Sequence, residues 1–120
     1  MKNLTYDERI AVMRILMDII LADSRVDSRE DKFFNELLDV LGLGGEARRD
    51  VEKLNSLLAL TFVHDFSQEQ KEEFAKLMGK MIIVDGDINY NEVKIYDVVN
   101  KFCNINIEFG IDDYPNFSHS

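Results

Sequence analysis

Apolar residues recur at three- and four-residue spacing along most of the chain, which is the period of a helix buried on one side. The first such segment contains Ile10, Met13, Leu16, Met17 and Ile20. It follows Thr5-Tyr6-Asp7-Glu8, a pattern typical of a capping box, in which a hydroxyl and a carboxylate bind free backbone N–H groups. A helix is therefore expected from about residue 6 to 22.

Three further capping boxes stand before apolar segments and predict the starts of three more helices. They are Asp27-Ser28-Arg29-Glu30, Ser67-Gln68-Glu69-Gln70 and Asn89-Tyr90-Asn91-Glu92. An additional helix over about 46–63 is indicated by apolar residues at Val51, Leu54, Leu57, Leu58 and Leu60. Together these patterns predict an all-α, compact helical bundle of about five main helices.

The chain also contains a weak internal repeat. When Asp23 is aligned with Asp85, Glu30 aligns with Glu92, and both copies keep the order helix, acidic loop, capping box, helix. Two copies separated by one extra helix predict a pair of helical hairpins packed about an approximate two-fold axis. Such packing would bring the two acidic loops near each other.

The length of 120 residues is that of one domain. We expect a helical domain over residues 1–105 and a C-terminal tail over 106–120, extended or partly disordered, because the helical period ends there. Within this tail and just before it, Ile105, Ile107 and Phe109 are expected to pack on the domain.

The formal net charge of −9 argues against nucleic-acid binding, which depends on basic side chains. It argues equally against docking on anionic lipid and favours a cation or a basic protein surface as the partner. Cys103 is the single cysteine, which excludes an intrachain disulfide and indicates a reducing compartment. With neither a signal peptide nor an apolar segment of membrane-spanning length, the protein is expected to be cytoplasmic, with no direct membrane insertion.

The acidic loops suggest a divalent-cation site. Asp85, Asp87 and Asn89 alternate as at the start of a calcium-binding loop, and oxygen ligands favour Ca²⁺ or Mg²⁺. The full EF-hand pattern fails, because Tyr90 and Tyr96 stand where it has glycine and glutamate. A composite site remains, formed by Asp23, Asp27, Glu30, Asp85, Asp87 and Glu92.

A second interpretation explains the same carboxylates without a ligand. Asp27, Glu30 and Glu92 fit helix caps, and Asp23 and Asp85 fit turns. Arg25 lies in the first loop, where it would repel a cation. Both interpretations stay open at the level of sequence.

An enzyme is a third class of function and the least supported one. His64 falls in a turn and His119 in the tail, so neither is paired in sequence with a nucleophile. We therefore expect a protein that is not an enzyme, with a hydrolase-like activity as the remaining alternative.

The two acidic stretches resemble the hallmark of the tellurite-resistance TerB family and its TerB-like relatives. Val84-Asp85-Gly86-Asp87-Ile88-Asn89 with Glu92 matches it well, whereas the first copy has Ser24 in place of the usual glycine. The resemblance covers about residues 8 to 105. It implies an all-helical domain with an acidic cluster proposed as a metal site, and a role in stress or toxic-anion resistance beside membrane-associated protein partners.

These observations predict a non-enzymatic cytoplasmic binding or scaffold module of a stress-response system, with a divalent cation held by the two acidic loops. The alternative is a purely structural protein–protein interaction domain, in which the carboxylates only cap helices. The sequence does not determine the oligomeric state.

Overall fold

The computed structural model describes residues 3–23 and 25–110, and within them the chain forms six α-helices and no β-strand. The helices are α1 (Tyr6–Leu21), α2 (Ser28–Val40), α3 (Ala47–Lys53), α4 (Ser56–His64), α5 (Gln68–Ile83) and α6 (Tyr90–Phe102). The predicted all-α helical bundle is confirmed.

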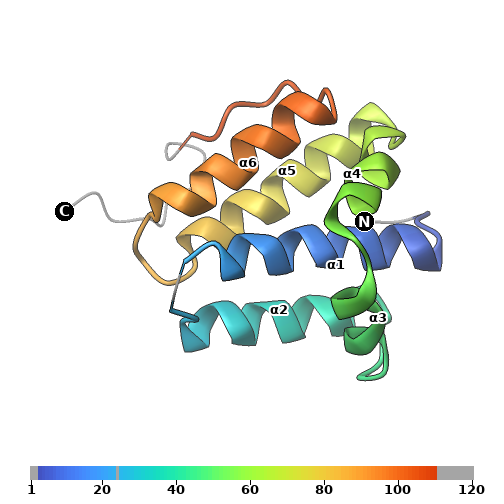
Figure 1. The fold of residues 1–120 in the computed structure, drawn as a ribbon, viewed down its shortest axis with the longest axis horizontal. Coiled ribbons are helices and arrows are strands. Elements are labelled where there is room, and N and C mark those ends of the chain that lie inside the picture. Colours follow the sequence, from blue (N-terminus) through green and yellow to red (C-terminus); the bar gives the residue numbers. More distant parts are fainter. Residues whose placement is uncertain (1–2, 24, 111–120) are drawn as a thin grey trace.

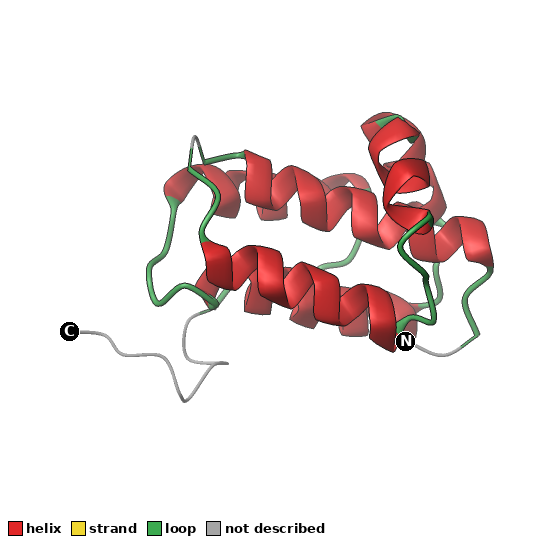
Figure 2. Ribbon diagram, turned by 90° about the horizontal axis from the view of Figure 1, so that it is seen from below, coloured by secondary structure: helices red, strands yellow, loops and turns green. Residues whose placement is uncertain are grey.

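The helices form two antiparallel hairpins that lie side by side, α1 with α2 and α5 with α6 (Figures 1 and 2). The short α3 and α4 connect them. The loops at the tips of the two hairpins lie at the same end of the bundle (Figure 1). This arrangement brings together the two acidic stretches of the internal repeat.

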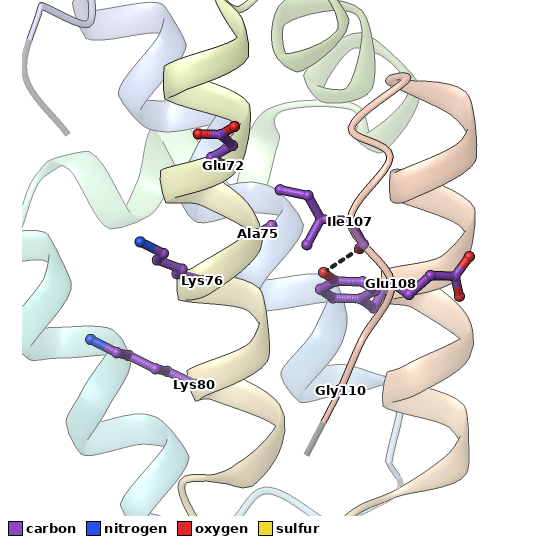
Figure 3. A pocket seen from close by; sticks show the side chains of 8 residues that line it. Glu72, Ala75, Lys76, Lys80, Ile107, Glu108 and Gly110 are labelled. Atoms are coloured by element: carbon purple, nitrogen blue, oxygen red, sulfur yellow. Dashed lines mark hydrogen bonds between the residues drawn. The ribbon is translucent and has the colours of Figure 1, made fainter. Parts of the chain in front are cut away.

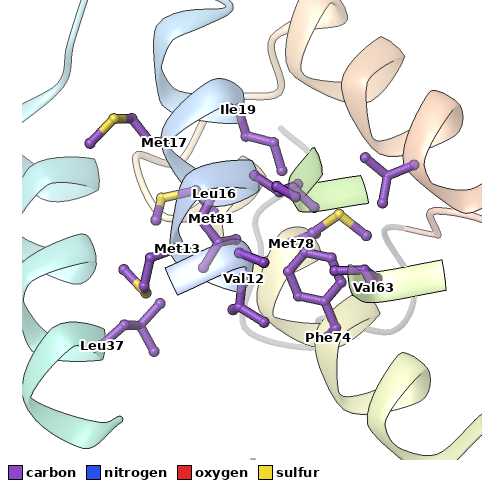
Figure 4. Packing of buried hydrophobic residues seen from close by; sticks show 14 of the residues in the cluster. Val12, Met13, Leu16, Met17, Ile19, Leu37, Val63, Phe74, Met78 and Met81 are labelled. Carbon is purple, nitrogen blue, oxygen red and sulfur yellow. The ribbon is translucent and has the colours of Figure 1, made fainter. Parts of the chain in front are cut away.

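Helix α1 is the centre of the bundle and packs against each of the other five helices. Nine of its 16 residues are buried, more than the single face that a peripheral amphipathic helix buries. Figure 4 shows Val12 and Leu16 of α1 near Phe74 and Met78 of α5 in the core. The apolar faces of α1 and α5 therefore pack against each other in one core.

The helix predicted over 46–63 is wrong as a single element, because the chain breaks it into α3 and α4. Leu54 and Asn55 have extended backbone, with ψ of 131° and 135°. The Asn55 side chain caps α4 by accepting from the N–H groups of Leu57 at 2.8 Å and Leu58 at 3.4 Å. Arg14 of α1 stabilises the break by donating to the Glu52 carbonyl at 3.2 Å.

The segment after α6 packs on the bundle as far as Gly110. Ile105 is fully buried, and Ile107 and Phe109 lie against the core, as predicted. The Tyr96 hydroxyl donates to the Ile107 carbonyl at 2.7 Å, and the Asn100 side chain accepts from the Ile107 N–H at 3.0 Å. The predictions for the rest of the tail fall on residues 111–120, outside the described residues.

Three of the four predicted capping boxes are present, at Thr5, Asp27 and Ser67. The fourth differs and is described with the site below. Among the described residues, no helix combines the length and the apolar character that crossing a membrane requires.

The break between α3 and α4 yields a test of the fold. Replacing Asn55 with alanine removes the N-cap of α4 and should lower the free energy of unfolding by about 1 kcal/mol, or the melting temperature by about 4 °C. Asn91→Ala is the matched control, because its exposed side chain forms no hydrogen bond within the described residues. Thermal unfolding followed by circular dichroism measures both. Equal small effects of the two substitutions would contradict the capping role.

Candidate functional site

The loops at the tips of the two hairpins enclose an open cavity of about 300 Å³. The first loop connects α1 to α2 and the second connects α5 to α6. The charged residues lining the cavity are Asp23, Arg25, Asp27, Asp85 and Asp87. The structure therefore brings the two acidic loops together, as the packing of two hairpins predicts.

The aspartates of the loops accept hydrogen bonds from the backbone of their own turns. Asp23 accepts from the N–H of Arg25 at 3.4 Å, and Asp85 accepts from that of Asp87 at 3.0 Å. Asp87 accepts from the N–H of Ile88 at 2.9 Å. Gly86 between them has a φ of +80°, a conformation that side-chain-bearing residues rarely adopt. Each of these aspartates keeps oxygen lone pairs beyond its turn.

Asp27 differs from the other loop carboxylates because Arg29 occupies both of its oxygens. The guanidinium donates through Nε to Oδ1 and through Nη2 to Oδ2, both at 3.1 Å. The Arg29 backbone N–H adds a third bond at 2.7 Å. Hydrogen bonding with Arg29 lowers the pKa of Asp27 below its ordinary value. Asp27 is thus a helix cap held by Arg29, a contact that the sequence pattern did not predict.

Glu30 and Glu92 lie beneath the loops and are each only 1 % exposed. Oε1 of Glu30 accepts from the Asp27 N–H at 3.3 Å, which completes the capping box of α2. A proton on one of the two carboxyls joins the side chains in a hydrogen bond. When both are ionised, Oε2 of Glu30 and Oε1 of Glu92 are buried without a hydrogen-bond partner within the described residues. Buried oxygens in this state cost about 1–3 kcal/mol each, so they require an explanation.

The prediction that Glu92 completes a capping box with Asn89 is wrong. Asn89 does cap α6, and its side chain accepts from the N–H groups of Asn91 at 2.8 Å and Glu92 at 3.3 Å. The Glu92 side chain does not return to the Asn89 N–H but is buried beside Glu30. Packing of one hairpin on the other therefore overrides the local pattern.

Burial raises the pKa values of both glutamates. Burial is the largest cause for each, and it raises the pKa of Glu92 to about 9, helped by the neighbouring Glu30 and by Asp85 and Asp23. Burial also raises the pKa of Glu30 above its ordinary value, although its hydrogen bonds partly oppose this. Two adjacent buried carboxylates cannot both ionise cheaply, so in the absence of a cation the pair holds a proton at neutral pH.

The six predicted metal ligands are brought to one end of the bundle but not into a complete ligand shell. Among the described residues, no group of three or more histidine, cysteine, aspartate or glutamate side chains is arranged to hold a metal ion. Glu30 and Glu92 are buried and do not line the cavity. Of the aspartates that do line it, Asp27 is held by Arg29.

His64 lies far from this site. It contacts Asp65 at 3.2 Å, and its ring meets that of Phe102, at the end of α6 opposite to Glu92. About 13 residues of helix, or roughly 20 Å, separate the two ends of α6. His64 is therefore no partner for the acid pair.

A larger cavity, of about 450 Å³, lies between α5, α6 and the segment that follows α6 (Figure 3). Its floor includes Ala75 and Ile107. In Figure 3, Lys76 and Lys80 extend from α5 away from that segment, and Glu108 extends away from α5. Because these charged groups do not converge on the floor, they do not form a cluster that could bind a ligand there.

Residues 1–53 match the family model described as "Tellurite resistance protein TerB". This range reaches the end of α3 and includes the first acidic loop, so the predicted resemblance to TerB is confirmed over these residues. The second acidic loop lies outside the matched residues.

Among solved structures, the chain is similar to the protein of unknown function PG1108 from Porphyromonas gingivalis W83, with a TM-score of 0.76. The two share 16 % sequence identity, over 98 % of this chain and 92 % of the other, which establishes a common fold. No curated protein matches the sequence.

The acid pair predicts how stability changes with pH in the metal-free protein. Unfolded Glu92 ionises near pH 4.5, whereas folded Glu92 keeps its proton to about pH 9. The folded state therefore binds more protons in this window, and the free energy of unfolding should fall as pH rises through it, by up to about 1.4 kcal/mol per pH unit.

Glu92→Gln should flatten this dependence and raise the melting temperature at pH 8, since a glutamine needs no proton uptake on folding. The exposed Glu36→Gln is the control and should follow the unsubstituted protein. Thermal melts from pH 5 to pH 9 in a chelating buffer measure the effect. A slope unchanged by Glu92→Gln would show that Glu92 is ionised in the folded state.

Proposed function

We propose that this protein is a non-enzymatic cytoplasmic binding module of a stress-response system, and that it holds a divalent cation between its two acidic loops. The observation that carries the proposal is the pair of buried oxygens on Glu30 and Glu92, which, when both carboxyls are ionised, lack hydrogen-bond partners in the described part of the chain. The match of residues 1–53 to TerB supports the stress-response context.

The donor set is chemically suited to a hard cation. Carboxylate oxygens are the ligands that Ca²⁺ and Mg²⁺ prefer, and such ions tolerate waters in the remaining positions. Glu30 and Glu92 would supply the buried oxygens, and Asp23 and Asp85 the oxygens from the loops. A bound cation would supply the positive charge that lets both glutamates ionise, so cation uptake would release the proton that the pair holds.

Arg25 and Arg29 set the limits of such a site. Arg25 lines the cavity and Arg29 binds both oxygens of Asp27. Two guanidinium groups near the opening reduce its affinity for cations, because like charges repel. A weak site, saturated near millimolar cation, fits this balance better than a tight one.

The second candidate is a protein–protein interaction domain in which the acidic residues only cap helices. The contact between Asp27 and Arg29 favours it, because it explains Asp27 without a ligand. In that case the shared proton alone reconciles the two buried glutamates. Both candidates include a protein partner, which the resemblance to TerB suggests lies at a membrane.

The two candidates differ in how cations affect stability. Metal-stripped protein should show a saturable rise in melting temperature on titration with Ca²⁺ or Mg²⁺, because a ligand that binds only the folded state stabilises it. At about 100 times the dissociation constant the stabilisation is about 2.7 kcal/mol. Mn²⁺ and Zn²⁺, titrated separately, report selectivity.

Matched variants make this measurement specific to the site. Glu92→Gln should abolish the rise, Asp23→Asn with Asp85→Asn should weaken it, and Glu36→Gln should leave it unchanged. No rise at several millimolar of any ion would exclude the cation site and favour the capping interpretation. A rise that survives in Glu92→Gln would place the cation elsewhere.

A further inference from the structure

An apolar groove lies between α4 and α6, over the C-terminal end of α1. Its cavity measures about 390 Å³. Leu21 of α1, Leu60 of α4 and the α6 residues Ile95 and Val98 line it. The groove lies apart from the acid pair, which is buried between the hairpins.

Large apolar side chains are exposed on this same face. Leu21 is 57 % exposed and Val98 is 56 % exposed, although both line the groove. Leu57, three residues before Leu60, is 69 % exposed, and Phe102, four residues after Val98, is 49 % exposed. Exposed apolar residues gathered on one face of a small protein mark an interaction surface, whereas scattered ones do not.

The groove favours a helix as its occupant. Its walls are helices, whose backbone N–H and C=O groups are already paired, so a partner strand would find no backbone to pair with. Ile95, Val98 and Phe102 stand at three- and four-residue spacing on α6 and form an apolar row about two turns long. An amphipathic helix presents a complementary row from one of its faces.

The charges beside the groove identify the partner's chemistry. Lys94 and Lys101 lie on the exposed face of α6 next to Val98, and neither forms an ion pair with any described residue. The Lys94 ammonium lies 4.8 Å from the centre of the Tyr90 ring, and Asp97 lies between the two lysines in the sequence of α6. The one carboxylate that lines the groove, Asp18, is held by Arg14 at 2.9 Å and by the Ser56 hydroxyl at 2.7 Å. With two lysines and one aspartate, the α6 edge of the groove keeps a net positive charge, on a chain whose net charge is −9.

We propose that the groove between α4 and α6 binds an amphipathic helix of a partner protein that carries acidic residues beside its apolar row. Charge complementarity of this kind selects partners and speeds association. A second copy of this chain fits less well, because a two-fold contact in which the two α6 helices pack antiparallel about Val98 would set Lys94 of one copy against Lys101 of the other.

Two synthetic peptides test the proposal. Both are helices of about 16 residues with leucines at three- and four-residue spacing, beginning at positions 1, 4, 5 and 8. Glutamates flank the leucines in one peptide and lysines flank them in the other. They are titrated into isotopically labelled full-length protein at low salt and followed by NMR. The glutamate peptide should bind, with shifts confined to the groove, and the lysine peptide should bind at least tenfold more weakly.

Variants separate this groove from the rest of the surface. Val98→Asp should abolish binding, and Val40→Asp, at a still more exposed site on α2, should not. Lys94→Glu with Lys101→Glu should reverse the preference between the two peptides. Exposed substitutions of this kind leave the fold intact, which unchanged melting temperatures verify.

Each other outcome overturns the proposal. Equal binding of both peptides, or binding that survives Val98→Asp, would show a contact elsewhere or without charge selection. No shift at millimolar glutamate peptide would exclude a helix of this chemistry. Dimerisation in sedimentation experiments that Val98→Asp abolishes would make a second copy the occupant.

Discussion

The packing of the α1–α2 hairpin against the α5–α6 hairpin buries one glutamate from each hairpin in the same space, Glu30 of α2 and Glu92 of α6. The two acidic loops lie directly above this pair. Glu30 and Glu92 occupy equivalent positions of the internal repeat, so the approximate symmetry of the sequence becomes a physical conflict between two like charges. A shared proton or a bound cation relieves that conflict. Either solution couples the stability of the whole bundle to the chemistry of its acidic end, since both hairpins contribute to the pair.

The fold was accessible from the sequence because its signals are local and agree with one another. Helical apolar periods, three working capping boxes and the absence of proline before Pro115 all indicate helices. The break at Asn55 could not be predicted in this way, because the sequence there lacks glycine and proline and its apolar residues continue through the break. It depends on Asn55 as a cap and on Arg14, a residue of another helix, to bind the carbonyl that the break leaves free.

The site could be predicted only in outline, because its details depend on contacts between helices. The sequence indicates two acidic loops, and the repeat indicates that they meet. Whether a carboxylate caps a helix, pairs with an arginine or is buried depends on tertiary contacts: Asp27 binds Arg29, and Glu92 leaves its cap to face Glu30. The basic edge of the groove was also hidden, because Lys94 and Lys101 become significant only when α4 and α1 place apolar residues beside them.

The protonation state of the acid pair is the quantity on which this account depends most directly. It is measured by following the carboxyl carbon signals of Glu30 and Glu92 by NMR in metal-free protein between pH 4 and pH 10, with the two signals assigned by substitution. We expect one of the two carboxyls to be still protonated at pH 7, and the Glu92 signal to titrate near pH 9. Two fully ionised carboxylates at pH 7, without any cation, would contradict it.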